Sequence, residues 1–270
     1  MAAMAWRKVL SLLTFLVISA AGPAVAQPIH LRYEAHWGGL HAADFGLSFD
    51  VGPADYDNWF RLRTRGMTDW IARLDIEAHG QGRVSAGRPL EGRAYRVDYT
   101  NRWRSRTMAI RYDPDGGEAH TTLVTHQENE PDEDNELPRE HRMGVLDPLT
   151  GLAEAIRRLR AHLEADGPPA FRLALFDGRR RFDLEGEFLG RKTRNILDRR
   201  HEVYHLRLTT RAVAGFKERF RGVWDGSAFD VYLTRDGRYL PLQIDSIGPG
   251  PLLNLVEECS GRCPLPVPER

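Results

Sequence analysis

Alternation of apolar and polar residues with a period of two runs along most of this chain, and it limits the fold more than any other feature. Successive side chains of a strand point to opposite faces of a sheet, so such segments are typical of half-buried strands. Gly38-Gly39, Asp177-Gly178 and Asp236-Gly237 separate several of them and are typical of hairpins. The alternating segments are residues 31–37, 45–49, 60–65, 95–99, 108–112, 171–176, 181–188, 204–212, 232–234 and 239–244.

One segment departs from this pattern and has helical spacing. Its apolar residues share one stripe: Leu149, Leu152, Ile156, Leu159 and Leu163. Asp147 suits the N-cap, Pro148 suits the first turn, and Gly167-Pro168-Pro169 ends the segment. A striped helix among strands has to bury its stripe against a sheet. We therefore predict a mainly β fold: a strongly curved antiparallel sheet, or open barrel, packed on one amphipathic helix at about residues 148–163.

The first 26 residues predict a cleavable signal peptide. Two basic residues precede an apolar run, Val9–Ala21, which is too short to be a permanent membrane anchor. Ala24 and Ala26 form a small-x-small cleavage site, so the mature chain is expected to begin at Gln27. We expect export to the periplasm; the alternative is an uncleaved N-terminal anchor.

We expect residues 27–270 to form a single β-rich domain with a C-terminal tail at about 257–270. Residues 128–138 are acidic and contain proline, which is typical of an exposed loop. A calcium loop is the alternative, but the segment lacks the glycine and the distal glutamate of an EF-hand.

The balance of charge narrows the range of partners. The chain has 38 basic and 38 acidic residues, and a nucleic-acid partner would favour a basic face. No long apolar run follows the signal peptide, so we expect no transmembrane segment in the mature chain.

The two cysteines, Cys259 and Cys263, predict a local disulfide. An oxidising compartment favours pairing of nearby thiols. In an extended strand their Cα atoms would be about 13 Å apart, but a turn at 260–262 brings them within reach. Two free thiols are the alternative; a metal site is disfavoured because no further Cys or His lies beyond His205.

Residues 201–205 match the zinc-protease pattern H-E-x-x-H. That chemistry needs a helix, on which His201 and His205 would share one face about 6 Å apart. The surrounding residues alternate as in a strand with its polar side exposed, and a strand would hold the two histidines about 13 Å apart. A zinc hydrolase using His201, Glu202 and His205 therefore remains only an alternative.

Other catalytic motifs are missing from the sequence. It contains no G-x-S-x-G elbow, no phosphate-binding G-x-x-x-x-G-K loop and no G-x-G-x-x-G. We predict a protein that is not an enzyme, with no catalytic residue, cofactor or metal site.

Arginines recur at a spacing of two, which places each set on one face of a strand. The sets are Arg61, Arg63, Arg65 and Arg102, Arg104, Arg106. Guanidinium groups suit phosphate or carboxylate ligands. The alternative is a solvated face with cross-strand ion pairs to residues such as Glu77 or Asp98. We expect Arg179-Arg180-Arg181, at a hairpin turn, to be exposed.

Tryptophan is abundant beyond the signal peptide. We expect most of these side chains to fill the core, and the alternative is that some line an apolar pocket. The residues are Trp37, Trp59, Trp70, Trp103 and Trp224.

Six short segments occur in an order that is specific when they are taken together: Tyr33–Ala43, Gly66–Trp70, Leu146–Leu152, Phe176–Asp183, Ala214–Phe216 and Asp236–Leu242. Together they resemble a bacterial envelope family, the domain of unknown function 3108 (DUF3108). The resemblance spans roughly residues 29–247 and implies an envelope location. By analogy it implies an architecture similar to the curved sheets of periplasmic lipoprotein carriers. It supplies no catalytic residues.

Together these observations favour a non-enzymatic periplasmic protein that binds a lipid, a lipoprotein or another amphipathic envelope component. The alternative is an envelope-maintenance module that recruits proteins by strand addition and has no small ligand.

Overall fold

The structure is a computed structural model that describes residues 28–114, 117–125, 137–165 and 167–266. Three predicted features lie wholly or partly outside these residues. They are the signal peptide at 1–26, residues 128–136 of the acidic loop and the last four residues of the C-terminal tail.

All the strands of the described residues belong to one antiparallel sheet. Its order is β7-β6-β5-β4-β3-β2-β1-β13-β12-β11-β10-β9-β8, so most neighbours in the sheet are also neighbours in sequence. The strands are β1 (Ile29–Trp37), β2 (Leu40–Val51), β3 (Asp55–Thr64), β4 (Asp75–Arg83), β5 (Glu91–Thr100), β6 (Ser105–Tyr112), β7 (Ala119–Thr125), β8 (Ala170–Phe176), β9 (Arg181–Ile196), β10 (Arg199–Ala214), β11 (Ala228–Leu233), β12 (Pro241–Ile247) and β13 (Leu252–Glu258).

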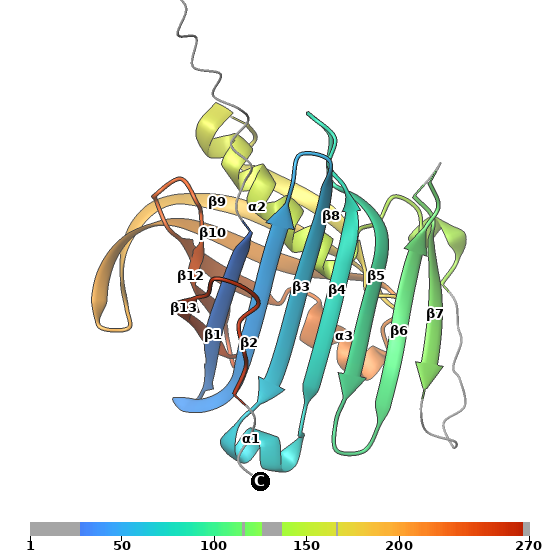
Figure 1. The fold of residues 1–270 in the computed structure, drawn as a ribbon, viewed down its shortest axis with the longest axis horizontal. Helices are drawn as coiled ribbons and strands as arrows, with labels where there is room; N and C mark the ends of the chain where they lie inside the picture. The colour runs from blue at the N-terminus through green and yellow to red at the C-terminus, as the bar shows by residue number, and fades with distance from the viewer. Residues whose placement is uncertain (1–27, 115–116, 126–136, 166, 267–270) are drawn as a thin grey trace, which may run out of the picture.

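The sheet curls but stays open. Figure 1 shows β1–β7 in front, β8–β10 behind them, and helix α2 (Pro148–Ala165) lying across the space between. Strands β7 and β8 end the strand order, and no pairing joins them in the described part of the chain. The predicted fold class, a strongly curved antiparallel sheet on one amphipathic helix, is confirmed.

Helix α2 packs on both halves of the sheet. Leu149 and Ala153 join a core cluster with β1–β6. Ala155 and Leu159, farther along the helix, join a second cluster with β8–β11. The predicted start at Pro148 is correct, and the helix continues two residues beyond the predicted end.

Asp147 caps α2 from a fully buried position. Its Oδ1 accepts hydrogen bonds from the backbone N–H groups of Leu149 and Thr150, at 3.1 and 2.9 Å. The Thr150 hydroxyl donates to Oδ2 at 2.6 Å and also bonds the Tyr56 hydroxyl at 2.7 Å. The cap therefore ties the helix to β3 as well as satisfying its first amides.

The chain between β7 and α2 joins the two ends of the sheet. The Ala119 N–H of β7 donates to the carbonyl of Arg142 at 3.0 Å. A few residues on, Leu146 N–H donates to Ala174 of β8 at 2.9 Å, and Phe176 N–H donates back to Leu146 at 2.8 Å. Part of each edge is thus already hydrogen-bonded within the molecule.

Several elements carry no clear sequence signal. The short helices α1 (Gly66–Ile71) and α3 (Glu218–Trp224), the 3-10 turn η1 (Arg139–His141) and three strands, β4, β7 and β13, were not predicted. In β4, Gly80 and Gly82 interrupt the alternation. A Cβ at Gly82 would lie 2.0 Å from the Glu91 carbonyl oxygen and 2.4 Å from the Tyr56 hydroxyl, so close packing excludes a side chain there.

Candidate functional site

Helix α2 does not fill the hollow of the sheet. A cavity of about 750 Å³ lies against the inner face of β4–β6, at the side where α3 and the β8–β9 turn approach. We call it the aromatic cavity. Its volume lies within the range of about 300–1,000 Å³ that small-molecule sites occupy. Its lining comes from β4, β5, β6 and the β5–β6 turn on one side and from residues 177–180 and α3 on the other.

Apolar and aromatic side chains form most of this lining. Tyr95, Val97 and Tyr99 alternate along β5 and so share one face. Met108 on the neighbouring β6 and Trp224 at the end of α3 also line the cavity. This is the lining that an apolar molecular body requires.

Arginines line the same cavity. Arg104 and Arg106 contribute from one side and Arg179 and Arg180 from the other. The Arg180 guanidinium stacks 5.4 Å from the Trp224 ring and 5.7 Å from the Phe216 ring, so two aromatic faces hold it in place. The Arg106 guanidinium lies 6.0 Å from the Tyr99 ring.

One carboxylate, Asp177, also lines the cavity. It accepts hydrogen bonds from the backbone N–H groups of Arg179 and Arg180, at 2.9 and 2.7 Å, and thereby shapes the turn. Burial raises the pKa of Asp177, and these hydrogen bonds oppose that shift. Arg180 Nη1 lies 3.9 Å from Asp177 Oδ2, and the lining as a whole contains four guanidinium groups and this one carboxylate.

The arginine pattern of the sequence needs correction here. Arg102, Arg104 and Arg106 were expected on one face of a strand, but β6 begins at Ser105, so the first two lie in the turn before it. Arg179, Arg180 and Arg181 were expected to be exposed, but all three are half-buried. Arg179 and Arg180 line the cavity, and Arg181 pairs with Asp183 at 2.6 Å. A curled sheet places these distant segments side by side, which strand periodicity alone does not reveal.

The arginines of β3 form cross-strand ion pairs, as the alternative interpretation of the sequence predicted. Arg61 binds Asp75 bidentately at 3.0 and 3.1 Å and lies 3.3 Å from Glu77. Arg63 donates to Asp75 at 3.0 Å. Arg65, just beyond β3, pairs with the buried Asp44. Cross-strand pairs therefore account for this set.

Two other cavities flank α2. One of about 140 Å³ has a mainly apolar lining with three arginines, Arg157, Arg160 and Arg238. Each arginine already pairs with a carboxylate of the chain: Arg157 with Glu154, Arg160 with Glu164, and Arg238 with Asp236 and Glu258. That volume holds a benzene-sized group. The other, of about 780 Å³, has a more polar lining. The aromatic cavity alone of the three combines a large aromatic lining with arginines from two sides.

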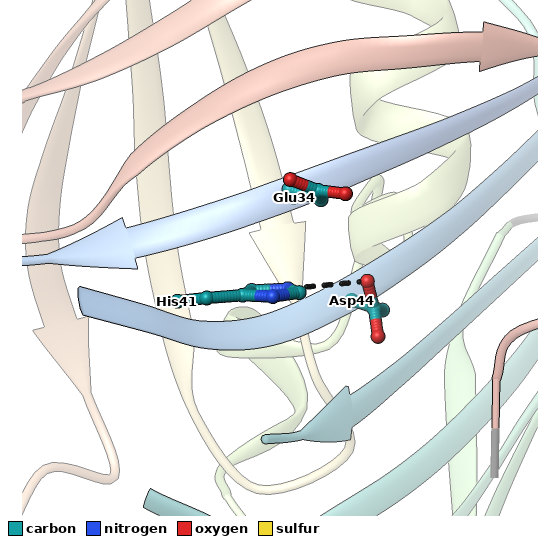
Figure 2. Close-up of side chains that lie close together, drawn as sticks. All are labelled: Glu34, His41 and Asp44. Carbon is teal, nitrogen blue, oxygen red and sulfur yellow. Dashed lines mark ion pairs between the residues drawn. The ribbon is translucent and has the colours of Figure 1, made fainter. Parts of the chain in front are cut away.

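A cluster of possible metal ligands lies on β1 and β2. Figure 2 shows Glu34, His41 and Asp44 facing one another, with an ion pair of 3.2 Å between His41 Nε2 and Asp44 Oδ1. Asp44 is 1% exposed and also pairs with Arg65, and Arg32 lies 3.9 Å away. Because arginines already neutralise the buried carboxylate, the cluster is better explained as an ion-pair network than as a cation site.

A second such cluster groups Asp113, Glu118 and His120. Glu118 pairs with Arg139 at 2.7 Å and with Arg142 at 3.1 Å. Arginines thus neutralise the Glu118 carboxylate as well, so this cluster is also better explained as an ion-pair network than as a cation site.

The H-E-x-x-H residues lie on strand β10, as the alternation predicted. Two residues four apart on a strand are separated by about 13 Å, so His201 and His205 do not share a metal ion. The expectation that this polar side is exposed is wrong for His205, which is 8% exposed. It stacks on Tyr232 and pairs with Asp230 at 3.0 Å. Glu202 accepts a hydrogen bond from Thr193, away from both histidines.

The prediction that most tryptophans fill the core is wrong. Trp59 is buried, but Trp37, Trp70 and Trp103 are more than half exposed. Trp37 ends β1, Trp70 lies in helix α1, and Trp103 lies in the turn between β5 and β6. Trp224 lines the aromatic cavity, as the alternative prediction of an apolar pocket allowed.

Cys259 and Cys263 are paired in the structure, with their Cα atoms 5.6 Å apart. The segment that follows β13 packs on the side of β2 and β3 away from α2. Leu265 approaches Gly46 there, and Arg262 stacks 5.6 Å from the Trp59 ring. Residues 257 and 258, expected in the tail, belong to β13.

None of the described helices combines the length and the apolar character needed to cross a membrane.

Comparison with known proteins gives a family but no activity. One structure similar to this chain is described as the "Crystal Structure of Beta-barrel-like Protein of Domain of Unknown Function DUF1849 from Brucella abortus". Its TM-score is 0.49 and its identity 11%, over 85% of this chain and 98% of that one. No curated protein matches the chain. A family model, "Protein of unknown function (DUF3108)", matches residues 32–251. This match spans most of the sequence and confirms the resemblance, so the chain belongs to the DUF3108 family.

Proposed function

We propose that the protein is an exported, non-enzymatic binding protein for an amphipathic molecule with an apolar body and an anionic head, such as a lipid or the acylated part of a lipoprotein. The observation that carries the proposal is the aromatic cavity, where an apolar lining and four arginines meet. Export rests on the signal-peptide features of residues 1–26.

The apolar residues and the arginines of the cavity suggest how such a molecule would bind. The inner face of β5 and Met108 would contact the apolar body. Arg104 and Arg179 approach from the two sides and would hold the anionic head by charge-assisted hydrogen bonds. Arg180 is stacked between two rings, so its guanidinium needs little further ordering on binding.

The alternative, a protein-recruiting module without a small ligand, has less support. Strand addition needs a free sheet edge. The connection through Arg142 and Leu146 already bonds part of the β7 and β8 edges. A zinc hydrolase has less support still, because β10 separates His201 from His205.

Titration calorimetry with three probes tests the proposal. We expect dodecyl phosphate to bind, dodecyl maltoside to bind at least about tenfold more weakly because it lacks the charge, and inorganic phosphate not to bind measurably. Val97→Trp should abolish binding by filling the cavity. Thr122→Trp, which adds the same side chain at an exposed position of β7, should leave it unchanged.

A second pair of variants tests the head group. Arg104→Gln with Arg179→Gln should weaken dodecyl phosphate by about tenfold or more, since each charged hydrogen bond contributes roughly 1.5–3 kcal/mol. Arg96→Gln removes an exposed arginine of β5 that pairs with Asp98, and should have no effect. Absence of binding to the unmodified protein, or full binding to folded Val97→Trp, would contradict the proposal.

A further inference from the structure

Exposed apolar side chains are concentrated at one end of the sheet. Of the eleven exposed large apolar residues in the described part of the chain, six lie in three turn segments. These six define what we call the tryptophan end: Trp37, Leu40, Met67, Trp70, Ile71 and Trp103. Their exposed fractions run from 54% to 71%.

Topology brings the three segments to the same end. Neighbouring strands from β1 to β6 are antiparallel, so β1, β3 and β5 all run in one direction. The β1–β2 turn, helix α1 and the β5–β6 turn follow these strands, and Figure 1 shows all three along the lower edge of the sheet. The exposed apolar residues of the three segments therefore lie at the same end of the sheet.

Hydrogen bonds hold the three segments together. Arg65 N–H, at the start of α1, donates to the Ala42 carbonyl of β2 at 2.8 Å. On the other side of α1, Arg102 bonds twice: its backbone N–H reaches the Ala72 carbonyl at 3.0 Å and its Nη1 reaches the Trp70 carbonyl at 2.7 Å. The tryptophan end is thus one supported surface rather than three separate loops.

Helix α1 is the most exposed part of this surface among the residues that the structure describes. None of its residues is buried, and its apolar members Met67, Trp70 and Ile71 are all more than half exposed. A short helix that buries nothing gains little from folding. A contact outside the chain would explain why these positions are apolar.

The tryptophan end carries more basic than acidic residues, which favours an anionic partner. Residues 37–41, 66–74 and 101–104 contain three arginines, Arg73, Arg102 and Arg104, and one carboxylate. That carboxylate, Asp69, accepts a hydrogen bond from Thr64. Indole rings settle at the headgroup level of a bilayer, and arginines pair with lipid phosphates.

We infer that the tryptophan end docks on an anionic membrane surface. Several apolar side chains at one end of the sheet can enter the headgroup region together, while Arg73 and Arg102 beside them contact the phosphates. Docking does not depend on the aromatic cavity. If both hold, the cavity opens beside the membrane, because Trp103 and Arg104 belong to both surfaces.

Vesicle flotation of the purified protein tests this inference. We expect binding to vesicles of phosphatidylethanolamine with phosphatidylglycerol, weaker binding to phosphatidylcholine alone, and release as salt screens the arginines. The triple variant Met67→Ser, Trp70→Ser, Ile71→Ser should lose about tenfold or more in affinity, because three apolar side chains no longer insert.

A matched triple variant is the control. Leu189→Ser, Leu197→Ser, Ile247→Ser removes three other exposed apolar residues and should bind vesicles like the unmodified protein. All variants keep the same N-terminal segment, so any membrane binding by that segment is the same in each of them. A difference in vesicle affinity between the two triple variants therefore reports on the substituted residues of α1. Circular dichroism checks that each is folded. The inference would be overturned if the unmodified protein did not bind anionic vesicles, or if both triple variants lost the same affinity. It would also be overturned if position 70 crosslinked to another protein in cells while the purified protein did not bind vesicles.

Discussion

At the scale of single residues, Asp147 combines two roles that conflict electrostatically. As an N-cap its carboxylate satisfies the first amides of α2, but it is fully buried, and burial disfavours charge. Burial raises its pKa from 3.8 to about 6, against the opposing effect of the hydrogen bonds from Thr150 and Leu149. The folded chain therefore holds this proton more tightly than the unfolded chain does.

This gives a prediction for the pH dependence of stability. The stabilisation from the Asp147 proton is complete below about pH 3.8 and is lost as the pH rises through about 6. One pKa unit is about 1.4 kcal/mol, so the loss is on the order of 3 kcal/mol. Asp147→Asn keeps a capping oxygen but cannot ionise, and should remove this part of the slope in urea unfolding between pH 4 and pH 7. Asp55→Asn, at an exposed carboxylate, should keep the slope; equal slopes in the unmodified protein and Asp147→Asn would contradict the assignment.

Local residue patterns predicted some residues of the aromatic cavity but not how they come together. The arginine spacing drew attention to Arg104 and Arg106, but their meeting with Arg179 and Trp224 depends on the curl of the sheet. Exposure of Trp37, Trp70 and Trp103 could not be read from their type, because hydrophobicity predicts burial only on average.

At the scale of elements, strong periodicity and turn chemistry predicted well. The helix begins at Pro148 as predicted, and Asp177-Gly178 and Asp236-Gly237 lie in the turns between β8 and β9 and between β11 and β12. β4 was missed because glycines interrupt its alternation, and α1 because a six-residue helix that buries nothing has no apolar stripe to detect. The order of the strands in the sheet also lies beyond local pattern, since β13 pairs with β1 across the whole chain.

The C-terminal segment yields a prediction at this scale. The Cys259–Cys263 disulfide closes a loop of five residues, for which the chain-entropy model gives about 2 kcal/mol. Cys259→Ser should therefore lower the free energy of unfolding by about this amount or less, while export and folding are retained. Urea unfolding followed by tryptophan fluorescence measures the loss, and free-thiol labelling of denatured, unreduced protein checks the bond. Two reactive thiols in the unmodified chain would show that the bridge is not formed.

At the scale of the whole molecule, one property links the proposals: the sheet curls far enough for both of its halves to pack on α2, but it stays open. Two core clusters, one with each half of the sheet, hold the helix. The segment through Arg142 and Leu146 fastens the two edges of the sheet to each other. The aromatic cavity lies between strands β4–β6 and α3, and the β5–β6 turn belongs both to its lining and to the tryptophan end.

The central claim, that this open sheet holds an anionic amphiphile, is tested most directly by native mass spectrometry of the protein purified without detergent. The account predicts a non-covalent adduct with the mass of an acyl-bearing anionic molecule on the unmodified protein, and the bare chain mass for folded Val97→Trp. Repeated recovery of the unmodified protein as the bare chain, or the same adduct on Val97→Trp, would contradict it.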